Sequence, residues 1–288
     1  MKKRNYYCLV AGLPDIVIDD KKMAMPPVQL RDYLEQELHP DDFGMVKLFY
    51  LPWDHQNLVQ ILFHSVPKWD DRGNYTREEM ETLANKRQLD FVEPEKYPAY
   101  FISFLEDFFN DDMETTETGA LAQLTECWYN MLDSHPNEFV RQVASFGRTK
   151  GNVMLALNGR KHQLDYEKAL IGDDDITTAL KKSRARDFGL SGEVAYIDNL
   201  TQIFETNNIL EREQKIDNQQ WNYLDEITVF DYFTAEKVLA FVLKYFMVER
   251  WFVLEKEKGQ EMFGRLLQEL QSNFEFPDEF TINYGKRK

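Results

Sequence analysis

Residues 51–64 of the chain read Leu51-Pro-Trp-Asp-His-Gln-Asn-Leu-Val-Gln-Ile-Leu-Phe-His64, LPWDHQNLVQILFH. It holds an aspartate and two histidines, residue types common in metal and catalytic sites. His55 and His64 are nine residues apart, whereas histidine pairs that bind zinc on a helix are separated by three or four positions. An aspartate just before an apolar run is instead typical of a helix N-cap, because its carboxylate accepts otherwise unpaired backbone N–H groups. We therefore expect Asp54 to begin a helix, with Asn57 able to reach back to the cap.

Most other segments have the apolar spacing of an amphipathic helix, so the expected fold class is mainly α, with many helices. Pro52 is expected to interrupt a helix, and Gly259 to separate the last two helices. Thr76 and Asp173 to Asp175 have the pattern of N-terminal caps. The first ~15 residues fit either a strand or a helix. The expected helices cover residues 28–38, 45–51, 54–64, 76–87, 99–110, 119–133, 137–157, 176–182, 194–207, 209–229, 234–258 and 261–270.

The chain has 288 residues, of which 43% are hydrophobic and 14% aromatic. A folded chain of this length buries roughly three quarters of the surface of its unfolded form, which allows a sizeable core. We expect a single helical domain or a compact helical array over residues 1–288.

The sequence is strongly acidic, with 50 Asp and Glu residues, 34 Lys and Arg residues and a formal charge of −16. Such a surface repels phosphate groups, so a nucleic-acid partner is not expected. No run approaches the ~20 apolar residues that cross a bilayer, so direct membrane insertion is not expected either. A basic protein partner fits this charge, although an acidic surface more often only keeps a protein soluble.

Motifs for catalysis are missing. The sequence has no GxxxxGK[ST], GxGxxG or GxSxG motif, and Ser191 lacks the spacing of a nucleophile elbow. Cys8 and Cys127 form no ligand motif and are expected to be buried thiols of a reducing compartment. We predict no catalytic residue, no cofactor and no metal. The alternative is a metal-dependent enzyme with an acidic cleft that uses Asp173 to Asp175.

Asp54-His-Gln-Asn57-Leu-Val-Gln-Ile-Leu resembles the D-x-x-N-[LV]-x-x-[IL]-[LI] helix pattern of the C (or d) subunits of V/A-type ATPases. Asn152, in Thr149-Lys-Gly-Asn152-Val-Met-Leu, is a second and weaker echo. Glu249 marks a third, where that family usually has acid-x-x-Asn-Leu-Arg and this sequence has Trp251 and Phe252 instead. The start, Tyr6 to Asp15, also resembles an uncharacterised bacterial family encoded among V-type ATPase subunits. Asp54, Asn57, Asn152 and Glu249 are thus the expected family-like structural motif.

This resemblance implies three related helical units, near residues 1–95, 96–190 and 191–288. It also implies a non-catalytic central-stalk subunit that couples the rotor shaft to the membrane ring. The implied partners are the shaft and ring subunits of a V-type ATPase. The implied location is the cytoplasm, peripheral at the inner membrane through that complex. A helical adaptor unrelated to ATPases is a further alternative. Whether the complex would move protons or sodium is left open.

Overall fold

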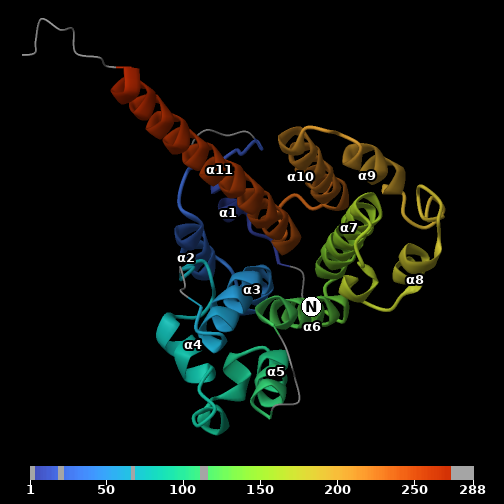
Figure 1. The fold of residues 1–288 in the computed structure, drawn as a ribbon. Helices are drawn as coiled ribbons and strands as arrows, with labels where there is room; N and C mark the ends of the chain where they lie inside the picture. Colours follow the sequence, from blue (N-terminus) through green and yellow to red (C-terminus); the bar gives the residue numbers. More distant parts are fainter. Residues whose placement is uncertain (1–3, 19–22, 66–68, 111–115, 274–288) are drawn as a thin grey trace, which may run out of the picture. The chain divides into compact units, whose positions relative to one another are not determined.

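The computed structural model describes residues 4–18, 23–65, 69–110 and 116–273, with side chains up to Leu254. It confirms the expected fold class, because the described chain is mainly helical and contains only an isolated β-bridge between Asn5 and Thr234 (Figure 1). The α-helices within these ranges are α1 (Tyr7–Gly12), α2 (Pro27–Glu37), α3 (Pro40–Leu62), α4 (Arg77–Leu83), α5 (Ala99–Phe109), α6 (Glu117–Asp133), α7 (Glu138–His162), α8 (Asp175–Lys182), α9 (Ile197–Phe204), α10 (Ile209–Ile227) and α11 (Ala235–Asn273).

The chain divides into two compact units. The first comprises Met1–Leu13 and Met25–Leu243, and therefore holds α1 to α10 and the first residues of α11. The second comprises Pro14–Ala24 and Lys244–Lys288, and holds the remainder of α11. The division into three related units near 1–95, 96–190 and 191–288 stays a prediction.

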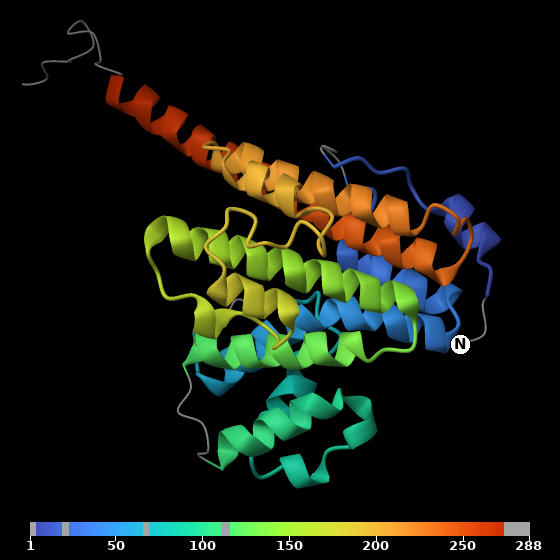
Figure 2. The same ribbon diagram turned by 90° about the vertical axis from the view of Figure 1, so that its right-hand side faces the viewer.

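In the first unit the helices pack against one another in a series. Helix α2 packs on α3, α3 on α6, α6 on α7, and α7 on both α8 and α9. Figure 2 shows the long helices α3, α6 and α7 running alongside one another. One apolar core lies among α3, α4, α5 and α6, with Phe101, Phe104 and Leu105 of the aromatic helix α5 almost fully buried. A second core joins α7, α8 and α9.

Helix α3 contradicts two expectations, because it runs from Pro40 to Leu62 without a break at Pro52. A proline inside a helix cannot donate to the carbonyl four residues earlier, which here belongs to Leu48. The indole Nε1–H of Trp128, on α6, donates to that carbonyl oxygen at 2.8 Å. The side chain of another helix therefore replaces the missing bond, and the helix continues. As a result Asp54 lies inside α3 and is no N-cap; His39 occupies that position.

Helix α11 contradicts the expected separation at Gly259, because it is continuous from Ala235 to Asn273. A glycine costs only about 1 kcal/mol in a helix interior, and strong helix formers stand on both sides. The ambiguous start of the chain forms the short helix α1. Both predicted caps are confirmed: Thr76 pairs reciprocally with Glu79, and Asp174 with Thr177.

Candidate functional site

The side-chain amide of Asn57 pairs with both backbone groups of one distant residue. Its Nδ2 donates to the carbonyl oxygen of Asp70 at 2.9 Å, and its Oδ1 accepts the Asp70 N–H at 3.0 Å. Asn57 itself is fully buried on α3. We call this arrangement, in which an amide side chain holds the N–H and C=O of a single residue, an asparagine clamp. It fixes the segment that leads into α4.

Asp54, one helical turn before Asn57, holds the same segment four and five residues after Asp70. Its carboxylate accepts the backbone N–H groups of Asn74 at 3.0 Å and Tyr75 at 3.2 Å, and the Asn74 side-chain amide at 2.7 Å. Gly73 passes so close that an added Cβ would lie 2.4 Å from Asp54 Oδ1. Only glycine therefore fits where this segment crosses α3.

Asn152 forms a second clamp of the same kind on α7. Its Nδ2 donates to the carbonyl oxygen of Ile171 at 2.8 Å, and its Oδ1 accepts the Ile171 N–H at 2.9 Å. The held segment leads into α8 through the capping box at Asp174, as the first leads into α4 through the box at Thr76. Asn57 and Asn152 thus stand in equivalent surroundings, each joining a long helix to the short helix that follows it.

Two features depart from this common pattern: the residue equivalent to Asp54 in the second clamp, and the third sequence echo, at Glu249. Thr149, three residues before Asn152, takes the place of Asp54 and is also buried. Glu249 lies on α11 in the second unit and is 8% exposed. Phe252, three residues later, is half-buried and has no amide with which to hold a backbone. The structure therefore brings Asp54 and Asn57 together on one segment and shows Asn152 in an equivalent role on another.

Burial shifts the pKa values of the two titratable groups in the opening stretch. Desolvation raises the pKa of Asp54 to about 6, although the hydrogen bonds from Asn74 and Tyr75 oppose this shift. Desolvation lowers the pKa of His55 to about 3. The His55 Nε2 lies 2.7 Å from the Tyr100 hydroxyl, and the ring is 1% exposed. At neutral pH His55 is therefore an uncharged core residue.

Two of the other sequence candidates, Asp174 and Ser191, have described contacts. Asp174 caps α8 and pairs with Arg148 at 3.2 Å, and the Ser191 hydroxyl donates to Asp187. Within the ranges that the structure describes, no three His, Cys, Asp or Glu side chains are grouped as a metal site would need. Cys8 is exposed and Cys127 only half-buried, so the expected burial of both thiols was wrong.

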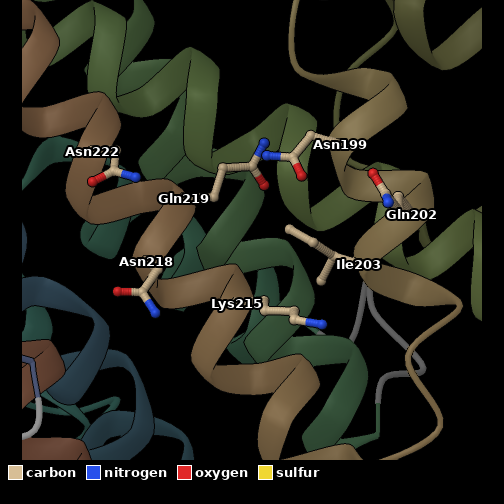
Figure 3. Close-up of a pocket in the computed structure, with 7 residues that line it drawn as sticks. All are labelled: Asn199, Gln202, Ile203, Lys215, Asn218, Gln219 and Asn222. Carbon is tan, nitrogen blue, oxygen red and sulfur yellow. The ribbon is translucent and has the colours of Figure 1, made fainter.

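A cavity of about 320 Å³ lies between α9 and α10 (Figure 3). Its polar lining consists of amides and one lysine, Lys215, which is paired with Glu211 at 2.7 Å. Gln219 is 9% exposed, and no described residue donates a hydrogen bond to its Oε1. The amides of the lining offer hydrogen bonds to neutral groups. The lining residues are Asn199, Gln202, Ile203, Lys215, Asn218, Gln219 and Asn222.

Sequence reasoning missed the residues that complete the first clamp. Gly73 and Asn74 are needed where the segment meets Asp54, and Arg31 on α2 donates to the Gly73 carbonyl. The available signal is the dipeptide Gly73-Asn74 in a polar stretch after an apolar helix, a pattern that by itself indicates only a turn. No feature of the sequence links it to a helix position about 20 residues earlier.

A protein-family model described as "Protein of unknown function (DUF2764)" matches residues 3–274. No curated protein and no solved structure matches the chain. Among the described residues, no helix has the length and apolar character needed to cross a membrane.

Proposed function

We propose that this chain, which belongs to the family of proteins of unknown function called DUF2764, is a non-catalytic central-stalk subunit of a V-type ATPase. In this role it resembles the C (d) subunit and couples the rotor shaft to the membrane ring. The proposed partners are the shaft and ring subunits. The proposed location is the cytoplasmic face of the inner membrane, where the chain is peripheral.

The observation that carries the proposal is the recurrence of the asparagine clamp. The resemblance to the C subunits rests on a helix pattern that contains Asn57 and recurs with Asn152. Both asparagines make the same pair of backbone hydrogen bonds, each to the segment that follows its helix. The pattern thus has one physical role at two places in the chain, as expected of related helical units.

A coupling subunit must transmit torque without deforming, and the clamps contribute to that stiffness. Each one ties the segment before a short helix to a long helix through two hydrogen bonds. The buried amides lie within packed helices, where local dielectric screening is weak and each bond is strengthened. The proposed function therefore requires rigid packing and complementary charge rather than a reacting group.

The first experiment is affinity capture of the tagged protein from gently solubilised native membranes, with the bound proteins identified by mass spectrometry. We expect V-type shaft and ring subunits in fixed ratio to the tagged chain. The charge of −16 favours a basic contact on the shaft, so raising the salt concentration should weaken capture of the shaft first.

Recovery of the protein alone, while the ATPase stays intact in the same extract, would contradict the proposal. Recovery of a different fixed set of proteins would support a helical adaptor unrelated to ATPases. Calorimetric titration with Mg²⁺ tests the alternative of a metal-dependent enzyme. That alternative requires the parent protein to bind Mg²⁺ and an Asp173→Asn, Asp175→Asn double variant to lose this binding.

A further inference from the structure

The cavity between α9 and α10 has a buried floor and an exposed polar rim. Two of its lining side chains are buried, Ile203 at 5% exposure and Gln219 at 9%, and we call them the floor. The rim consists of exposed amide side chains from both helices: Asn199 and Gln202 on α9, and Asn218 and Asn222 on α10. A small molecule could therefore enter from solvent, pass between the rim amides and reach the floor (Figure 3).

Gln219 presents an unused hydrogen-bond acceptor at the floor. Its Nε2 donates to the Tyr196 carbonyl oxygen at 3.4 Å. Because a carbonyl oxygen can only accept, this contact fixes which end of the amide is the nitrogen. The Oε1 atom is buried, and no described residue donates to it. A buried acceptor without a donor is costly, so the arrangement favours an occupant of the cavity that supplies an O–H or N–H group.

The walls of the cavity are held by packing outside it. The ring of Tyr196, just before α9, lies 4.8 Å from that of Phe146 on α7 and 6.4 Å from that of Tyr223 on α10, measured between centroids. At the other end, α9 stops at Phe204 and Asn208 already caps α10, so the connection is short. A site whose walls are already in place loses little conformational entropy on binding.

The lining that the structure describes is suited to uncharged partners. Its one charged side chain is Lys215, whose Nζ pairs with Glu211 at 2.7 Å and lies 3.4 Å from the Thr206 Oγ1. The remaining polar groups are carboxamides, each of which can both donate and accept. A hydroxyl group also donates and accepts, so a molecule with several hydroxyls matches the rim at several points.

We infer that the cavity between α9 and α10 binds a small uncharged sugar or polyol. One hydroxyl of the ligand donates to Gln219 Oε1, its C–H groups contact Ile203, and its other hydroxyls exchange hydrogen bonds with the rim amides. The cavity volume of about 320 Å³ lies at the lower end of the roughly 300–1,000 Å³ that is usual for ligand sites. The ligand is therefore a single sugar unit or a polyol of similar size.

Other classes of ligand fit this lining less well. A phosphate or carboxylate requires an available cation, whereas Lys215 is already paired with Glu211. A nucleobase requires a ring on which to stack, and the described lining contains none. An extended peptide rises about 3.3 Å per residue, while residues 199–203 span only about 6 Å of α9. About two peptide residues would thus be within reach of the rim.

The test begins with saturation-transfer difference NMR of the full-length protein with glucose, galactose, mannose, ribose, myo-inositol and glycerol in turn. We expect at least one of them to bind, and calorimetric titration then gives its affinity. In Gln219→Leu that affinity should fall at least about tenfold, because the ligand hydroxyl loses its acceptor. The urea midpoint should stay unchanged or rise, since Oε1 has no described donor to lose and the Tyr196 carbonyl keeps the bond from the Leu200 N–H at 3.0 Å. A merely structural role for Gln219 would lower the midpoint instead.

The matched control is Gln214→Leu, the same substitution on the same helix at an exposed position outside the lining; it should leave the affinity unchanged. Asn199→Ala, on the opposite helix, should weaken binding about threefold or more. Because Asn199 is exposed, this second variant decides if Gln219→Leu does not fold. The permethylated form of the sugar that binds best has no hydroxyl donor and should not bind.

Failure of all six compounds to bind would overturn the inference, since water alone would then fill the cavity. An affinity that neither Gln219→Leu nor Asn199→Ala lowers, or that Gln214→Leu lowers equally, would also overturn it. Tighter binding of the phosphate ester of the same sugar, or of an uncharged blocked dipeptide, would assign the cavity to another class of ligand. The inference goes beyond the proposed stalk role and does not depend on it, because the titrations use the protein alone.

Discussion

Asn57 and Asn152 each form hydrogen bonds with a backbone N–H and a backbone C=O that lie outside regular secondary structure. Leaving a buried backbone group unpaired costs more than the net value of one hydrogen bond, because the group has also lost its water. The asparagines therefore set how the segments before α4 and α8 are placed. Replacing either asparagine should therefore lower the free energy of unfolding rather than change an exposed surface.

For the Asn57→Leu variant we expect the free energy of unfolding to fall by about 2–3 kcal/mol, since the N–H and C=O of Asp70 both lose their partner. Asn152→Leu should lose a similar amount through Ile171. Chemical denaturation in urea measures both. The control is Asn222→Leu on α10, where an exposed side chain should change stability by no more than about 0.5 kcal/mol. Equal losses in all three variants would contradict the clamp interpretation.

His55 makes stability sensitive to acid. Its pKa is lowered from 6.5 to about 3 in the folded protein, so below 6.5 the unfolded chain takes up a proton that the folded chain does not. The contribution of His55 to stability is therefore lost as the pH falls. Between about pH 7 and about pH 5 the loss amounts to about 2 kcal/mol. Asp54 acts in the opposite direction, because its pKa is raised from 3.8 to about 6 and the folded protein binds the proton more tightly.

A His55→Gln variant removes the His55 contribution and leaves that of Asp54. Relative to the parent protein, its unfolding free energy should gain about 2 kcal/mol on going from about pH 7 to about pH 5. Urea denaturation of both proteins at the two pH values gives this difference directly. If both proteins have the same pH dependence, His55 is not the group that responds to acid.

At the scale of the helix, the bond from Trp128 to Leu48 explains how α3 accommodates Pro52. Trp128→Phe should leave the Leu48 carbonyl without a donor and cost about 1–3 kcal/mol. In a Pro52→Ala background the alanine N–H can donate to that carbonyl, so the same Trp128→Phe change should cost about 1 kcal/mol less. A double-mutant cycle measured by urea denaturation gives this coupling. Additive costs would show that the two positions act independently.

The helices could be predicted from the sequence because their apolar spacing is a local property. The break at Pro52 and the cap at Asp54 were predicted wrongly for a common reason. Trp128 is far along the chain from Leu48, and the partners of Asp54 are 20 and 21 residues away. The local pattern predicted that Asp54 would accept the nearest unpaired backbone N–H groups. In the folded chain its carboxylate accepts the N–H groups of distant residues instead. The equivalence of Asn57 and Asn152 was visible in the sequence, but their shared hydrogen-bond pattern was not.

At the scale of the whole molecule, the charge of −16 implies self-repulsion in the folded state. We expect the melting temperature to rise by a few degrees between about 0.02 and about 0.3 M sodium chloride, because salt screens this repulsion. Differential scanning calorimetry measures the change. An uncharged osmolyte at matched osmolality is the control for effects unrelated to charge. A melting temperature that falls with salt would show that the ion pairs outweigh the repulsion.

The clamp at Asn152 has a consequence for how this chain can change in length. It fixes Ile171, and α7 ends at His162, so the connection between them, which contains the 3-10 helix Glu167–Ala169, is anchored at both ends. Doubling the length of such a loop costs only about 0.6 kcal/mol in closure entropy. Leu164, which is 64% exposed, is therefore a place where natural insertions can accumulate and where a fluorescent or affinity label can be introduced without shifting α8.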